Sequence, residues 1–196
     1  MQEYLTATEI INWEDPAILE LARQLKGRTV TETAQNCFEW VRDNIKHSWD
    51  YRLNPVTCTA SEVLQAGTGH CFAKSHLLAA LLRANNIPAG LCYQRLSIND
   101  DGAPYSLHGL NAVLLPEYGW YRIDSRGNKA TVNAQFHPPV EQLAFKPAIE
   151  GEMDLPGIFS DPLPDVVAAL RNNPTSEAFV ANLPDLTPAN RTAFSL

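Results

Sequence analysis

The 196-residue chain has few cysteines, no basic cluster and no long apolar run, and each shortage excludes a class of protein. A run of about 18 apolar residues, the minimum for a membrane-spanning helix, is missing, so we expect no membrane partner. The formal net charge is −7 and Lys and Arg do not gather, so nucleic acid is not an expected partner either. The cysteines follow no metal-binding spacing such as C-x2-C, and they are Cys37, Cys58, Cys71 and Cys92.

The opening residues, MQEYLTATEIINWEDP, have neither a basic segment nor the apolar segment of a signal peptide. We therefore expect a cytoplasmic protein in which the thiols stay reduced and no disulfide framework forms. A chain of this length is most simply one domain over 1–196. We place its core at about 30–130.

Capping signals predict the first two helices. Asp15 followed by Pro16 starts a helix through AILELARQLKG that ends at Gly27. Thr29 and Glu32 form a capping box for a second helix with apolar residues at helical spacing.

The middle of the chain alternates loop and helix. HSWDYRLNPVTCT is interpreted as loop, and Thr59 with Glu62 caps the short helix ASEVLQA, which Gly67 ends. A long apolar helix begins near Cys71 and ends before Pro88.

Strands follow, and then a proline-rich segment. GLCYQRLSI is predicted as a strand, and LHGLNAVLL and WYRID form a hairpin around PEYG. Prolines then accumulate, so residues 131–196 are expected to wrap the core, with short helices near DVVAALRN and SEAFVANL. FHPPVEQLAF and EGEMD either border a cleft or only cover the sheet.

Cys71 lies in GTGHCFAK, where a glycine-containing loop becomes a helix. A thiolate is stabilised at a helix N-terminus, and the backbone N–H of Cys71 is a donor for an oxyanion. Thr68 or His70 is expected to cap the helix. Lys74 is interpreted as a solvated lysine with little influence on the thiol.

The base for this thiol must come from elsewhere in the chain. His76 is five residues along the helix and points to another side, and His70 is adjacent, so neither faces Cys71. As metal ligands, His70 and Cys71 with Cys58 or His47 would form no recognised zinc spacing, and we expect no metal.

The predicted hairpin offers His108 and Asp124, and its register decides whether they meet. They share a face if Leu110 or His108 lies opposite Asp124. His108 and Asp124 lie on opposite faces if Asn111 lies opposite Asp124. Together with Cys71 they would supply a nucleophile, a base and an orienting carboxylate.

The order Cys71, His108, Asp124, within GxGxC, ALLRANNIPAG and WYRID, resembles the transglutaminase-like superfamily over roughly 30–130. The resemblance implies an α+β, papain-like fold with N-terminal helices and a central core helix packed on an antiparallel sheet. It implies Cys71 as nucleophile, His108 as general base and then acid, and Asp124 as the residue that orients the imidazole. No metal or organic cofactor is required by this chemistry.

The chain departs from the family where many members read His-Ala-Trp and this one reads His108-Gly109-Leu110. In transglutaminases proper an upstream tryptophan assists the oxyanion, and Trp49 lies upstream here. Large β-domains typical of animal cross-linking enzymes are missing, so protein cross-linking is not implied. Other candidate donors to the oxyanion are Asn54, Gln65 and Gln94.

The leading hypothesis is a cysteine hydrolase or acyltransferase that acts on a peptide, protein or small amide through an acyl-enzyme. Peptidase or amidase activity is favoured over transfer to an amine. Two alternatives stay open: an arylamine N-acetyltransferase-like enzyme, although Arg-Gly-Gly does not precede the cysteine, and a non-catalytic interaction module on the same fold. Reactivity of the Cys71 thiol separates the enzymes from the module.

Overall fold

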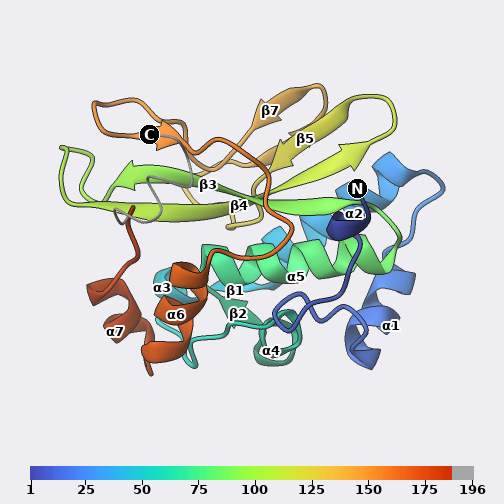
Figure 1. Cartoon of the computed structure of the whole chain (residues 1–196), viewed down its shortest axis with the longest axis horizontal. Helices are drawn as coiled ribbons and strands as arrows, with labels where there is room; N and C mark the ends of the chain where they lie inside the picture. Colours follow the sequence, from blue (N-terminus) through green and yellow to red (C-terminus); the bar gives the residue numbers. More distant parts are fainter. Residues whose placement is uncertain (187–196) are drawn as a thin grey trace.

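The computed structural model describes residues 1–186, in which helices pack beneath a curled antiparallel sheet (Figure 1). This α+β architecture confirms the expected fold class. Residues 187–196, which were expected to wrap the core, lie outside the described residues. The helices are η1 (Gln2–Tyr4), α1 (Pro16–Gln24), α2 (Val30–Asn44), α3 (Ser48–Tyr51), α4 (Ala60–Ala66), α5 (Cys71–Ala84), α6 (Pro164–Asn172) and α7 (Ser176–Ala181).

The main sheet has the strand order β5-β4-β3-β8, and every neighbouring pair in it is antiparallel. A two-residue parallel pair, β1 with β2, and a short hairpin, β6 with β7, lie outside it. The strands are β1 (Lys46–His47), β2 (Thr68–Gly69), β3 (Ala89–Ser97), β4 (Tyr105–Leu115), β5 (Gly119–Ile123), β6 (Gln135–His137), β7 (Val140–Gln142) and β8 (Met153–Asp154).

Helix α5 is the centre of the fold. It lies directly under β3 and β4 (Figure 1), and α1, α2 and α4 contact its other sides. The sequence FAKSHLLAALL is apolar nearly all round, the pattern of a helix enclosed by protein. Each of its fully buried leucines contributes roughly 1.5–3 kcal/mol to folding. These leucines are Leu77, Leu78, Leu81 and Leu82.

The capping signals hold with two corrections. Helix α1 begins at Pro16 but ends at Gln24 rather than Gly27. Thr29 caps α2, but the carboxylate of Glu32 accepts from the backbone N–H of Arg28, so the capping box is half formed. The capping box of α4 is complete.

The segment interpreted as loop after α2 contains structure. Its first residues are β1 and α3, and the parallel bridge of His47 with Gly69 fixes their position. One helical turn and a two-residue strand are too short to produce a periodic pattern. The prediction of an unbroken loop was therefore wrong.

The C-terminal segment borders the sheet and then returns to the helical layer. Strand β8 pairs with the free edge of β3, and Phe159 bridges to Leu91. The amide of Leu163 donates to the hydroxyl of Tyr93 at 3.1 Å. Helices α6 and α7 then fall at the two predicted sites and pack on the α5 side of the sheet (Figure 1).

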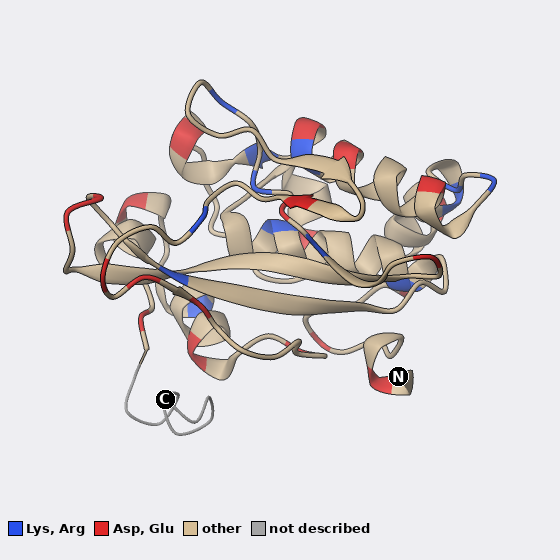
Figure 2. Ribbon diagram, turned by 90° about the horizontal axis from the view of Figure 1, so that it is seen from above, with Lys and Arg blue, Asp and Glu red and all other residues tan. Residues whose placement is uncertain are grey.

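Basic and acidic residues are interspersed along the described chain (Figure 2). Within residues 1–186, no helix has both the length and the apolar character needed to cross a membrane. The same residues contain no group of three His, Cys, Asp or Glu side chains arranged to hold a metal ion.

Candidate active site

Cys71 is the first residue of α5 and follows a tight connection from α4. Gly67 ends α4 with a φ of 65°, a left-handed conformation that favours glycine. The two residues of β2 then pair with β1, and His70 occupies the N-cap position of α5. The thiol therefore lies in the first turn of the central helix, as the sequence predicts.

The start of α5 receives no hydrogen bond from a capping side chain. His70 makes none, because its Nε2 pairs with the hydroxyl of Ser176 at 3.0 Å. Thr68 makes none, because its hydroxyl donates to the carbonyl of Lys46. His70 is thus the N-cap residue, as one of the two expectations had it, but its side chain makes no capping hydrogen bond. The partial positive charge of the first-turn N–H groups is left to act on Cys71.

The hairpin register brings His108 and Asp124 together. Asn111 pairs with Ile123, which sets Asp124 opposite Leu110. This is the first of the three registers considered from the sequence, and it puts His108 on the same face as Asp124, one diagonal step away. His108 Nε2 lies 2.8 Å from Asp124 Oδ2, and both residues are buried.

Cys71 reaches His108 at an open edge of the sheet. Alternate residues of β4 face α5, and Gly109 is one of them, so His108 projects from the other face. Strand β5 ends at Ile123, opposite Asn111, so β5 does not cover the part of this β4 edge that holds His108 and Gly109. There the Cys71 sulfur accepts from the N–H of Gly109 and hydrogen-bonds with the His108 imidazole.

The packing around Gly109 accounts for the glycine that stands in place of alanine in His-Ala-Trp. A Cβ built at this position would lie 2.6 Å from Cδ1 of Phe72 and 3.1 Å from its Cα. The first turn of α5 therefore approaches β4 too closely for alanine. This close approach also brings the thiol to the strand.

The Cys71 thiol differs electrostatically from the other three. Burial raises its pKa, but the neighbouring His108 and the Gly109 N–H outweigh burial and leave the pKa below its ordinary value. Burial alone dominates at the other sites. It raises the pKa to about 12 for Cys37, about 11 for Cys58 and about 12 for Cys92.

His108 and Asp124 are held as an ion pair. Burial lowers the pKa of His108, but the charges of Asp124 and Cys71 raise it to about 10. Burial likewise raises the pKa of Asp124, and His108 together with two backbone N–H groups brings it below its ordinary value. Those N–H groups belong to Arg126 and Ala144, each 3.1 Å from the carboxylate.

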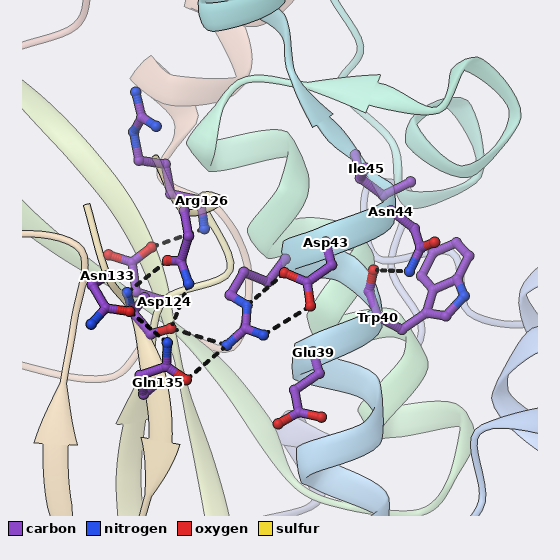
Figure 3. A network of polar contacts seen from close by, with 12 residues as sticks. Glu39, Trp40, Asp43, Asn44, Ile45, Asp124, Arg126, Asn133 and Gln135 are labelled. Atoms are coloured by element: carbon purple, nitrogen blue, oxygen red, sulfur yellow. Dashed lines mark hydrogen bonds and ion pairs between the residues drawn. The ribbon is translucent and has the colours of Figure 1, made fainter. Parts of the chain in front are cut away.

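Arg126 links this site to α3. Its backbone holds Asp124, as labelled in Figure 3, while its guanidinium contacts both oxygens of Asp50 at 2.6 and 3.1 Å. The aromatic ring of Phe145 lies edge-on to His108, with 5.0 Å between ring centres. Sequence reasoning missed these supports, because their partners are far apart in the chain.

The end of α2 is fastened to the loop that follows Asp124. The guanidinium of Arg42 contacts Asp43, the carbonyl of Ala134 and the side chain of Gln135 (Figure 3).

Lys74 lies beneath this network and donates to the carbonyls of Arg42 and Ile45. It is fully buried, which corrects its interpretation as a solvated lysine. Burial, assisted by the charge of Arg126, lowers its pKa to about 7.

A cavity of about 610 Å³ opens over Cys71 and His108. Trp49 and His47 line it from the α3 side, so the upstream tryptophan does border the site. Phe145 and Glu152 line it from the C-terminal segment, so part of that segment borders the cleft.

Three side chains proposed as oxyanion donors do not line the cavity. Asn54 accepts from the amide of Ser176, and Gln65 is an exposed residue of α4 that lines a different pocket. Gln94 donates to Asp154 and to the carbonyl of Phe145. The backbone N–H of Cys71, at the start of α5, remains a candidate donor to the oxyanion.

Comparison with known proteins identifies the family. The model of the transglutaminase-like superfamily matches residues 19–125, more than half of the chain, so the protein belongs to this superfamily. A search of curated proteins gives no match.

Solved structures with a similar chain path include a proposed cysteine protease from Cytophaga hutchinsonii, with 18% identity over 63% of this chain and a TM-score of 0.49. Another is the periplasmic domain of TgpA from Pseudomonas aeruginosa, with 19% identity over 62% of this chain and a TM-score of 0.46. The chain spans 40% and 45% of these two proteins.

Proposed function

We propose that the protein is a cysteine hydrolase or acyltransferase that acts on an amide bond through an acyl-enzyme at Cys71. The observation that supports this most strongly is the position of His108, which is bonded through Nε2 to Asp124 and lies close enough to Cys71 to lower the pKa of its thiol. A core imidazole with only a structural role has no need of a thiol at a helix start and a buried carboxylate together.

In the first half-reaction the thiolate attacks the amide carbonyl carbon and forms a C–S bond. The π electrons of the carbonyl move to oxygen, and the oxyanion accepts hydrogen bonds from the backbone N–H groups at the start of α5. The C–N bond then breaks as the His108 imidazolium gives its proton to the departing nitrogen. An amine and a thioester result. Asp124 steadies the imidazolium and fixes its orientation.

In the second half-reaction His108 takes a proton from the incoming nucleophile. Water gives a carboxylic acid, and an amine gives a new amide; either way the thiolate of Cys71 is expelled. We propose hydrolysis of a peptide, protein or small amide as the principal reaction. The same residues serve both outcomes, and access of water to the thioester decides between them.

The test is to trap the acyl-enzyme. The protein is mixed with a peptide p-nitrophenyl ester, quenched in acid and measured by intact mass and peptide mapping. We expect one acyl adduct, located on Cys71, absent in Cys71→Ala and unchanged in the control Cys58→Ala. An adduct elsewhere, or none, contradicts the proposal.

The same assay shows whether water or an amine accepts the acyl group. A second substrate pair tests the alternative enzyme. Addition of a primary amine partitions the thioester, so the ratio of acid to amide product measures hydrolysis against transfer. Turnover of acetyl-coenzyme A with an arylamine, without turnover of amides, would instead favour an N-acetyltransferase.

A further inference from the structure

One wall of the cavity comes from a part of the chain outside the family match. Helix α7 and the residues just after it follow the matched region, which ends at residue 125. They contribute three apolar side chains to the cavity, and these are Phe179, Val180 and Leu183. Phe72 and Leu107, from the core, line the cavity as well.

This wall is fixed in place by buried polar contacts. Ser176, at the start of α7, is fully buried, and its hydroxyl pairs with Nε2 of His70. Its amide donates to the side chain of Asn54 at 2.8 Å. The ring of Phe179 lies against the His70 ring, with 4.3 Å between centres.

The residues after α7 are fastened to the sheet as well. The amide of Leu107 donates to the carbonyl of Pro184 at 2.7 Å. Arg95 on β3 forms two contacts of 2.7 Å with the carboxylate of Asp185. Leu183 is therefore held between α7 and β4. A binding surface held this way loses little entropy when a ligand fills it.

The position of the wall indicates which part of a substrate it meets. The departing nitrogen has to lie near His108, which supplies its proton. Phe179 contacts His70 and Phe72, the residues on either side of Cys71. It therefore lies at the start of α5, on the side of the cavity where the backbone N–H of Cys71 would hold the acyl oxygen.

We propose that this wall is an acyl-side specificity pocket for a bulky apolar side chain, of the size of leucine or phenylalanine. The inference rests on the proposed function and names its substrate class. Phe179, Val180 and Leu183 are all apolar, so a charged acyl side chain placed against them would lose hydration and gain no polar contact from these three residues. An apolar one gains roughly 25 cal/mol for each Å² removed from water.

Exposed apolar residues at the cavity extend this surface toward solvent. Large hydrophobic side chains are mostly buried in this fold, but three of those that line the cavity are not. They are Trp49, Ile98 and Ile149, at 39%, 45% and 37% exposure.

The experiment is a series of peptide p-nitrophenyl esters that share a leaving group and differ only in the acyl residue: Gly, Ala, Leu, Phe, Asp or Lys. We expect kcat/KM for Leu and Phe to exceed that for Gly by about ten-fold or more, and Asp and Lys to be poorest. Val180→Asp should reduce the Leu rate by about ten-fold and raise the rate for Lys relative to Leu.

Val140→Asp is the matched control, since Val140 is 68% exposed on β7 and does not line the cavity. It should leave the series unchanged. A flat series, or a series that Val180→Asp does not alter, overturns the pocket while adducts at Cys71 still support the enzyme. Absence of any Cys71 adduct overturns both.

Discussion

At the scale of single residues, the four thiols of this chain should react very differently. Cys71 has a pKa below its ordinary value, whereas burial raises the pKa of Cys37, Cys58 and Cys92. We predict that iodoacetamide labels Cys71 at neutral pH at least about ten-fold faster than the others, because the thiolate is the nucleophile. Mass mapping of a time course measures this. Equal, slow labelling of all four would favour a non-catalytic module.

His108 is required for this difference. His108→Ala removes the charge and the hydrogen bond that lower the Cys71 pKa, so labelling should slow by about ten-fold or more at neutral pH. The circular dichroism spectrum should be retained. His76→Ala is a comparison, since His76 bonds to the carbonyl of Cys58 and does not face Cys71. Unchanged kinetics in His108→Ala would remove His108 from the mechanism.

Asp124→Asn tests the carboxylate. It keeps the shape of the side chain but removes the charge that raises the His108 pKa. We expect kcat to fall by roughly 10⁴-fold, as when the carboxylate of a triad is neutralised. Steady-state kinetics on a p-nitrophenyl ester measures this. A loss below about ten-fold would mean that Asp124 contributes little to the imidazolium.

The sequence was sufficient to propose Cys71, His108 and Asp124 as site residues. It was insufficient to predict the residues that surround them. A thiol at a loop-to-helix junction and two polar residues on a hairpin are local patterns. Two of the three registers considered from the sequence would bring the two hairpin residues together, and the structure has one of these two. The burial of Lys74 and the contact of Arg126 with Asp50 depend on chain segments that meet only in the fold. No local pattern encodes them.

At the scale of elements, the sequence likewise predicts what depends on a local signal and misses what depends on a distant partner. Long periodic or well-capped segments were predicted closely; the helix at 60–66 has its predicted bounds. Elements defined by a partner were missed: β1 and β2 exist because they pair with each other, and β8 because it pairs with β3. Strands of two residues have no sequence period of their own.

Lys74, which fastens α5 to the end of α2, gives the fold a pH dependence. Its pKa is about 7 when folded and 10.5 ordinarily, so between these values the unfolded chain binds more protons. Its contribution to the free energy of unfolding therefore rises with pH across this window. We predict that, as the pH rises from about 7 to 10.5, the free energy of unfolding of the wild type increases relative to that of Lys74→Met.

Urea denaturation of both proteins at several pH values measures this difference. The opposing contribution of His108, whose pKa is raised on folding, is present in both proteins and cancels. A difference in the free energy of unfolding that does not change with pH would contradict the role given to Lys74.

At the scale of the whole molecule, the C-terminal segment is bound to the core over much of its length. Arg83 of α5 donates to the carbonyls of Thr6, Ala89 and Ser160, and so ties the N-terminal segment and part of the C-terminal segment to the central helix. We propose that the core and this segment unfold as one unit. Calorimetry should give one transition whose calorimetric and van't Hoff enthalpies agree. Two resolved transitions would show that the segment and the core unfold separately, and would contradict this proposal.

We propose that the sulfur of Cys71 is anionic at neutral pH because helix dipoles and the His108 imidazolium stabilise the thiolate. The most direct measurement is a pH titration of thiolate ultraviolet absorbance, taken as wild type minus Cys71→Ser. We predict a thiolate signal that is already present at neutral pH and is lost only on acidification. A signal that first develops near pH 8.5, the ordinary value for a free cysteine at about 25 °C, would contradict the account.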